Sequence, residues 1–311
     1  KVNSIIKEYN YVPNLSARSL TVKSSHIIGV IVPLDDREDN GTSVSYFDNP
    51  YVSSMIGVIE RELRDNGYFV MIRAVRSQDD LSILMRNWNV DGAIFLYPRL
   101  GDRFEDSINA IVAETHLPVV LFDARTDNPE VINVCSDDRK GCYLSTRYLI
   151  NRGHKKIAFV ANYEGNPLLT DRFEGYRAAM EESGLGCDPD CIFSYSPSYE
   201  EGIAAGKAIA ASALKITGLV TTADICAIGI MEGARLGGLR IPTDLSVIGY
   251  DNLAVSTYTT PKLTTISQNV IKKAETAMEL LLEKLRTGHV EQPHIQLDVE
   301  LVERQSTLSL L

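Results

Sequence analysis

The sequence predicts an α/β fold of two doubly wound parallel-sheet subdomains, and three observations indicate it. The chain has 311 residues, 44% of them hydrophobic, which is enough apolar material for more than one core. Short β-branched runs alternate with stretches of helical periodicity, as in repeated strand–helix units. These units fall into two similar halves, at about 26–136 and 137–267.

The predicted strands are apolar runs without clean alternation, as expected for strands buried on both faces of a parallel sheet. In chain order they are 26–33, 68–75, 91–97, 117–122, 156–161, 216–222 and 245–250. Helical periodicity predicts helices at 50–66, 79–88, 102–115, 139–152, 172–184, 199–214 and 224–237. A long helix near 270–287 and one strand-like run at 294–302 follow. Because ligands bind beyond the carboxyl ends of parallel strands, two facing halves predict a ligand site in the cleft between them.

The amino-terminal segment differs from the rest in charge and pattern. Residues 1–25 hold four basic residues against one glutamate, so they carry +3 and the remainder carries −13 of the chain's net −10. An apolar stripe over residues 2–9 predicts a short helix. Residues 14–20 can form a second, very short helix with Asn14 as its cap. A basic segment on an acidic body suggests an appended piece that faces nucleic acid.

Enzyme and metal-binding classes lack their motifs. No G-x-G-x-x-G fingerprint, G-x-S-x-G elbow or H-E-x-x-H zinc motif occurs. The five cysteines make no C-x-x-C pair, so we expect free thiols in a reducing cytosol. We therefore expect a protein without cofactor, metal or catalytic residues.

Membrane and export signals are also missing from the sequence. No apolar run of about 18 residues occurs, and the amino terminus has no signal-peptide apolar region. We expect a cytoplasmic protein without a membrane partner. Because the chain begins without methionine, we also expect it to be a fragment of a longer one.

Many motifs resemble the lactose/galactose-repressor family of transcriptional regulators. KVNSIIKEYNYVPNLSARSL (1–20) is similar to the family's junction between the last helix of its DNA-binding headpiece and its hinge helix. The other matches, in the family's order, are FDNPYVSSMIGVIERELRDNGYFVMI (47–72), NWNVDGAIF (87–95), GCYLSTRYLINRGHKKIAFVA (141–161), DRFEGYRAAMEESGL (171–185), ADICAIGIMEGARLGGLRIPTDLSVIGYDN (223–252), PKLTTISQN (261–269) and ELVERQST (300–307). They cover nearly the whole chain.

The resemblance implies a type I periplasmic-binding-protein-like core with three crossovers, near 136, 267 and 294. The implied parts are a headpiece remnant and hinge segment at 1–25, a first subdomain at 26–136 plus 268–293, and a second at 137–267 plus 294–308. A homodimer would bind a small effector, a sugar or sugar derivative, in the cleft. Operator DNA would bind only to the full-length protein, because the helix-turn-helix lies upstream.

An exported sugar-binding protein of a transport system is the alternative, since it shares this fold. Such a protein would carry a signal peptide and no hinge. The basic segment at 1–25 and its NLSARSL hinge favour the regulator.

The family's motifs and the predicted strand ends indicate the ligand-binding residues. They are Asn49, Tyr51, Asp123, Arg172, Asp251 and Gln268. Tyr51 either stacks on a sugar ring or is an aromatic residue of the core. Arg172 offers a planar fork of donors to hydroxyls, and its alternative is a surface ion pair with Asp171 or Glu174. Asp251 alternatively caps a turn.

Other positions carry lesser expectations. In the family, hinge residues contact DNA, and the matching ones are Asn14, Ser16, Ala17, Arg18 and Leu20. Leu20 would wedge into the minor groove, or pack on the core without DNA. Ala223 stands where relatives have a ligand-contacting asparagine, so that contact is lost or replaced. Residues 34–47 form a lid or a solvated loop. Asp137 and Asp138 begin a helix, where carboxylates favour the dipole.

Overall fold

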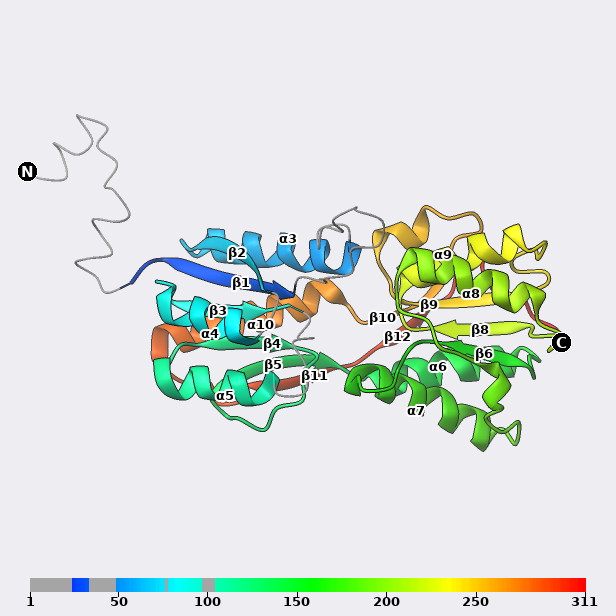
Figure 1. Ribbon diagram of the computed structural model, residues 1–311, viewed down its shortest axis with the longest axis horizontal. Coiled ribbons are helices and arrows are strands. Elements are labelled where there is room, and N and C mark those ends of the chain that lie inside the picture. The colour runs from blue at the N-terminus through cyan, green and yellow to red at the C-terminus, as the bar shows by residue number, and fades with distance from the viewer. Residues whose placement is uncertain (1–23, 34–48, 76–77, 97–103) are drawn as a thin grey trace, which may run out of the picture.

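The computed structural model describes residues 24–33, 49–75, 78–96 and 104–311. The predicted DNA-contacting residues of the hinge and the loop at 34–47 lie outside these ranges. Figure 1 shows two lobes placed end to end along the long axis of the molecule. The α/β fold predicted from the sequence is confirmed, with one mainly parallel sheet in each lobe.

The first lobe is built on a fully parallel six-stranded sheet of order β11-β5-β4-β3-β1-β2. Its strands are β1 (Ile27–Pro33), β2 (Phe69–Val75), β3 (Gly92–Phe95), β4 (Val119–Phe122), β5 (Val131–Ser136) and β11 (His294–Leu297). Its helices are α3 (Pro50–Asp65), α4 (Gln78–Asn87), α5 (Phe104–Thr115) and α10 (Val270–Thr287). Alternate strand residues face α3 with α10 on one side and α4 with α5 on the other, so two separate cores form.

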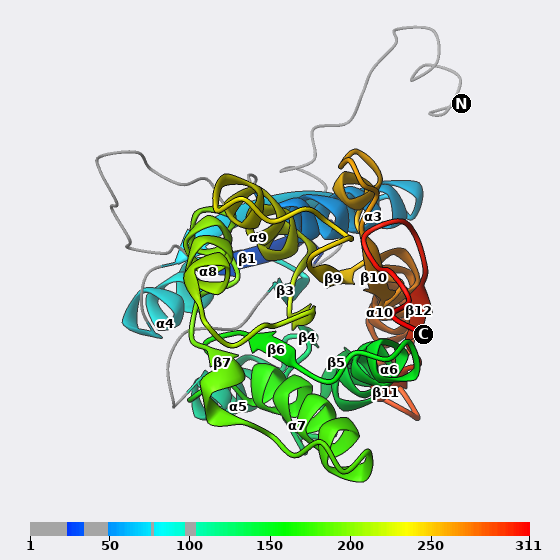
Figure 2. The same cartoon turned by 90° about the vertical axis from the view of Figure 1, so that its right-hand side faces the viewer.

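The second lobe repeats this plan with the sheet order β12-β10-β9-β8-β6-β7. Its strands are β6 (Ile157–Val160), β7 (Ile192–Phe193), β8 (Gly218–Thr221), β9 (Ser246–Asp251), β10 (Thr264–Ser267) and the antiparallel β12 (Glu300–Val302). Its helices are α6 (Asp138–Asn151), α7 (Pro167–Glu182), α8 (Tyr199–Ala211) and α9 (Asp224–Leu236), with 3-10 turns η2 (Pro189–Cys191) and η3 (Ala254–Thr257). Figure 2 shows α8 with α9 on one face of this sheet and α6 with α7 on the other.

The chain changes sheet after β5, after β10 and after β11. The third change lies between Leu297 and Glu300, later than the crossover near 294 that the resemblance implied. The residues 294–302 are not one strand. His294–Leu297 pairs with β5 in the first sheet, whereas Glu300–Val302 pairs with β10 in the second. The boundary placed at 294 is therefore wrong by one strand.

Helix starts set the positions of several site residues. Helix α3 begins with Pro50 at its first position, and the side chain of Asn49 accepts a hydrogen bond from the backbone N–H of Tyr51. Helix α7 begins the same way, with Asn166 as cap and Pro167 next, five residues before the predicted start at 172. Within the described ranges, no helix is long and apolar enough to cross a membrane.

Candidate functional site

Asp123 and Lys273 form a buried ion pair at the carboxyl end of β4. The Lys273 ammonium, which is fully buried, donates to Asp123 Oδ1 at 2.7 Å, to Asp123 Oδ2 at 2.9 Å and to Gln268 Oε1 at 2.5 Å. These three acceptors satisfy its three protons. Lys273 comes from α10, so this helix fixes the carboxylate that the sequence placed in the ligand site.

Tyr51 lies against the same carboxylate. Its hydroxyl donates to Asp123 Oδ2 at 3.0 Å. Burial raises the pKa of Tyr51 well above its ordinary value, and Asp123 raises it further, so the hydroxyl stays protonated as a donor. Asn49 is exposed, and its side-chain oxygen is engaged in capping α3.

Gln268 connects this pair to the second lobe. Its side-chain oxygen accepts from Lys273 and from the Ser136 hydroxyl at 3.2 Å, while its nitrogen donates to Asp251 Oδ1 at 2.5 Å. Asp251 ends β9 with a φ of 111°, and burial raises its pKa to about 7. A continuous chain of hydrogen bonds thus runs from Tyr51 through Asp123, Lys273 and Gln268 to Asp251. We call it the interlobe chain.

Arg172 is buried in the second lobe and forms neither of the surface pairs considered from the sequence. Its Nε donates to Asp138 Oδ1 at 2.7 Å, and Nη1 donates to the backbone oxygen of Thr222 at 2.5 Å. Its guanidinium carbon lies 3.7 Å from the ring centroid of Tyr250. Burial lowers the pKa of Arg172, but the surrounding acidic groups, Asp138 first among them, together outweigh this effect and hold the net pKa well above the ordinary value.

The expected partners of Arg172 bind elsewhere. Asp171 accepts from Arg125 of the first lobe at 2.7 Å, so this exposed ion pair bridges the lobes. Glu174 pairs with Arg177 on the surface of α7. The Arg125–Asp171 ion pair gives Arg125 a contact with the second lobe.

The groups from the two lobes lie close together. The pKa of Tyr51 is raised by Asp251, as it is by Asp123, and lowered by Arg172. Asp251 and Arg172 belong to the second lobe. Five of the six predicted ligand residues therefore gather between the lobes, at the carboxyl ends of β4, β9 and β10 and on α3 and α7. The sixth, Asn49, lies at the exposed amino terminus of α3.

Several residues of this region were missed by the sequence reasoning. Asp138 was interpreted only as a favourable charge at the helix start, yet it holds Arg172 and accepts from the Tyr250 hydroxyl at 3.1 Å. Lys273 carried a signal that could have been used, because it interrupts the apolar stripe of 270–287 on its buried side. Thr222 follows β8, and its buried hydroxyl oxygen has no hydrogen-bond partner within the described part of the chain.

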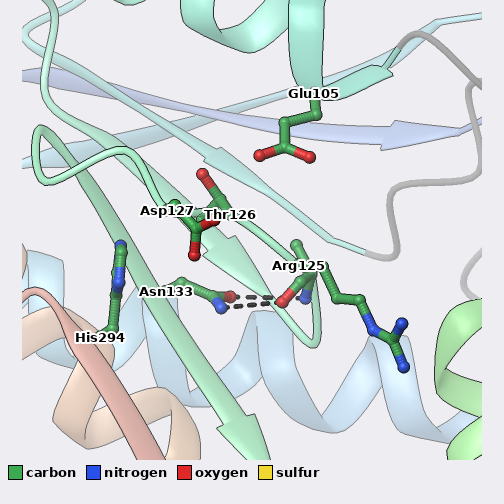
Figure 3. A pocket seen from close by; sticks show the side chains of 7 residues that line it. Glu105, Arg125, Thr126, Asp127, Asn133 and His294 are labelled. Atoms are coloured by element: carbon green, nitrogen blue, oxygen red, sulfur yellow. Dashed lines mark hydrogen bonds between the residues drawn. The ribbon is translucent and has the colours of Figure 1, made fainter.

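A separate hollow of about 360 Å³ lies on the first lobe alone (Figure 3). It is lined by Glu105, Ala124, Arg125, Thr126, Asp127, Asn133 and His294. The amide of Asn133 binds the backbone of Ala124 on one side of it. Figure 3 shows Arg125 extending away from the hollow. None of the six predicted ligand residues lines this hollow. In the described ranges no cluster of His, Cys, Asp and Glu is arranged to hold a metal ion.

Comparison with known proteins identifies relatives of this chain. Residues 146–307 match the periplasmic binding protein-like domain family. The HTH-type transcriptional repressor PurR of Pasteurella multocida is 30% identical over 98% of this chain and 88% of its own length. The ribose operon repressor of Haemophilus influenzae is 28% identical over 100% of this chain and 90% of its own length. A LacI family transcriptional regulator from Enterococcus faecium, solved with bound ribose, superposes with a TM-score of 0.78 at 27% identity, over 92% of this chain and all of that one.

These relatives decide between the two alternatives that the sequence left open. The two curated relatives are repressors and the solved one is a transcriptional regulator, which favours the regulator over the exported sugar-binding protein. The chain belongs to the LacI family of transcriptional regulators, on a periplasmic-binding-protein-like core.

Proposed function

We propose that this regulator binds a sugar or sugar derivative between its lobes and that the bound ligand selects one relative orientation of them. The observation that carries the proposal is the interlobe chain, which joins a wall of the first lobe to a strand end of the second. A ligand that replaces one of its hydrogen bonds changes the others. Only a difference in affinity between orientations can shift their equilibrium, and couplings of about 1–3 kcal/mol are typical.

Each lobe supplies complementary groups to this ligand. From the first lobe, the ring of Tyr51 stacks on a sugar face and Asp123 accepts from a hydroxyl. From the second lobe, Arg172 donates through Nη2, because its hydrogen bonds to the described residues are made by Nε and Nη1, and Asp251 accepts. Gln268 lies beside the second crossover, so a ligand that displaces its hydrogen bonds would also affect that crossover.

Two further positions extend the ligand site. Asn49 uses its side-chain oxygen in the helix cap and retains its amide nitrogen as a donor. Thr222 offers the buried hydroxyl that lacks a partner among the described residues. It stands next to Ala223, which has no polar side chain to supply the contact expected there.

Relatives support a sugar as the ligand class. The solved Enterococcus faecium regulator holds ribose. A LacI family regulator from Lactobacillus casei holds sucrose; it is 25% identical, with a TM-score of 0.76 over 90% of this chain and 99% of that chain. We infer that the ligand is bound without chemical conversion, and that the protein acts in the cytoplasm, where operator DNA lies.

A homodimer completes the proposal. A two-fold dimer matches a palindromic operator, and the spacing of the first lobes would set whether the two hinge segments can order on DNA. The exposed edge strand β2, with Phe69 54% and Met71 42% exposed, is our candidate for part of the dimer contact.

The test is calorimetry of Arg172→Ala against a sugar panel, with Arg177→Ala as control. Both arginines lie on α7, but Arg177 is exposed and pairs only at the surface. We expect Arg172→Ala to weaken binding by about tenfold or more and Arg177→Ala to leave it unchanged. Since Arg172→Ala leaves Asp138 buried without its cation, circular dichroism checks folding, and Arg172→Lys serves as a milder variant. Unchanged affinity in folded Arg172→Ala removes this residue from the site.

A further inference from the structure

The charged groups between the lobes offer no free positive charge to a ligand. Lys273 already has three acceptors for its three protons. The charge of Arg172 is met by Asp138 at 2.7 Å, with both side chains at least nine-tenths buried. Within the described ranges these are the two buried cations of the interlobe region, and each is paired with a carboxylate.

Carboxylates outnumber cations in the same region. Besides Asp123 and Asp138, the buried Asp224 and Asp251 lie here. Burial raises the pKa of both carboxyl groups; the charge of Asp251 raises the pKa of Asp224 further, and that of Asp138 raises the pKa of Asp251. Asp251 accepts from the Gln268 amide, and Asp224 accepts from the backbone N–H of Leu253 at 2.8 Å and from Thr265. Neither forms an ion pair in the described part of the chain. The region is therefore neutral or negative.

Helix amino termini, the other usual source of positive potential, are also occupied. The helices that supply site residues are α3, α6, α7, α9 and α10. Helix α10 begins after Asn269, whose side chain caps it by accepting from the backbone N–H of Lys272. Helices α3 and α7 begin with a proline, which lacks an N–H, and an asparagine cap. Helix α6 is capped by Asp137 and has Asp138 in its first turn, and α9 has Asp224 in its first turn. An anion at such an end would meet a carboxylate or a filled cap instead of free N–H groups.

We propose that the cleft accepts an uncharged, hydroxyl-bearing ligand and rejects the phosphate ester of the same sugar. This inference rests on the proposed function and refines its ligand class. Carboxylates accept hydrogen bonds from sugar hydroxyls, whereas a phosphate buried beside Asp251 would lack a cation to offset its desolvation. The internal pairs Asp123–Lys273 and Asp138–Arg172 are thus the specificity-determining feature, because they cancel the charges that would otherwise attract an anion.

Calorimetry with matched pairs tests the proposal on the intact chain at pH 7.5. The pairs are D-ribose with D-ribose 5-phosphate, D-glucose with D-glucose 6-phosphate and sucrose with sucrose 6-phosphate. In the pair that binds, we expect the neutral sugar to bind more tightly than its ester by about tenfold or more. An ester that binds equally or better overturns this inference and leaves ligand sensing intact. If no member of any pair binds, the proposed sugar-sensing function itself fails.

Asp138→Asn sharpens the test. The amide keeps an oxygen that can accept from Arg172 and Tyr250 but removes the negative charge, so Arg172 becomes an uncompensated cation. We expect the preference for neutral sugar over ester to fall by about tenfold, mainly through tighter binding of the ester. Asp244→Asn is the control, because it makes the same change in a surface pair with Arg240, and its preference should equal that of the wild type.

A second variant keeps the test decisive if Asp138→Asn does not fold. Asp251→Asn also removes one negative charge from the cleft, and the amide can still accept from Gln268. The preference should again fall. A folded variant of either kind that retains the full wild-type preference contradicts the charge argument.

Discussion

Asp137 and Asp138 are chemically identical neighbours that the fold uses differently. Asp137 caps α6 by accepting from the backbone N–H of Lys140 at 3.0 Å. Asp138 points into the second lobe, where it binds Arg172 and Tyr250. The dipole argument that the sequence supports therefore accounts for Asp137, while the role of Asp138 depends on helix α7 and strand β9 lying against α6.

Lys273 provides a stability prediction at the scale of one residue. Lys273→Met removes the cation and leaves Asp123 partly buried without its ion pair, so we expect a loss of about 3–5 kcal/mol in the free energy of unfolding. Lys272→Met is the matched control, since Lys272 is exposed and next in sequence. Urea denaturation measures both.

Adding Asp123→Asn to Lys273→Met should recover part of that loss, because it removes the unpaired charge. If the two single changes are simply additive in the double variant, the ion pair does not couple these residues energetically.

The pKa of Asp251 predicts a pH dependence. Burial raises this pKa to about 7 in the folded chain, so the folded state binds the proton more tightly than the unfolded state. The resulting stability is present in full at acidic pH, below the ordinary aspartate pKa, and is lost as pH rises through about 7.

Asp251→Asn removes this titration, so wild type should lose stability relative to the variant by about 1–3 kcal/mol between pH 5 and pH 8. Urea denaturation across that range measures the difference. Parallel profiles for the two proteins would show that Asp251 titrates at the same pH in both states.

Among the elements, α8 and α9 pack closely because glycines line their contact. An added Cβ at Gly229 would lie 2.2 Å from the backbone oxygen of Tyr199, and one at Gly206 would lie 2.3 Å from that of Ile230. These distances are too short for any side chain. The glycines therefore permit an approach of two backbones that the hydrophobic pattern of either helix does not specify.

Gly229→Ala should accordingly destabilise the chain by about 1–3 kcal/mol, because the two helices must separate. Gly57→Ala is the control. Gly57 lies in α3 with open space around it, so alanine should stabilise by about 0.5–1 kcal/mol through helix propensity. Thermal unfolding compares them. A neutral Gly229→Ala would mean that α8 and α9 can shift apart at little cost.

Among the described residues, the two lobes meet through three chain crossings, the Arg125–Asp171 ion pair, the interlobe chain and the packing of Leu253 and Val255 against the core of the first lobe. The exposed ion pair contributes little to stability, so it would hardly oppose the change of lobe orientation that we propose for ligand binding. Large apolar side chains on the β2 edge remain exposed in the single chain.

The dimer prediction follows from this edge. Phe69→Glu should shift sedimentation toward the monomer, because a charge there would be buried in the proposed contact. Leu311→Glu is the control, since Leu311 is 89% exposed at the far end of the second lobe. A Phe69→Glu protein that sediments as wild type places the contact elsewhere.

Most of the strands that the sequence predicted are buried along their length, although the half-exposed edge strand β2 was predicted too. Strands such as β1 and β4 are apolar throughout, so local pattern suffices. The strands β5, β7 and β10 were not predicted. In β10 the buried Thr264, Thr265 and Ser267 look like loop residues until their hydrogen-bond partners are known.

By itself the sequence determined the α/β class, the two-lobed plan, the family and the strand ends where the proposed ligand residues lie. Only the tertiary structure decided the pairings. Lys273 and Asp123 are 150 positions apart, Asp138 meets Arg172 through two packed helices, and residues 294–302 divide between two sheets. Periodicity reports how each residue faces its own core, whereas a buried ion pair depends on how distant elements pack against each other.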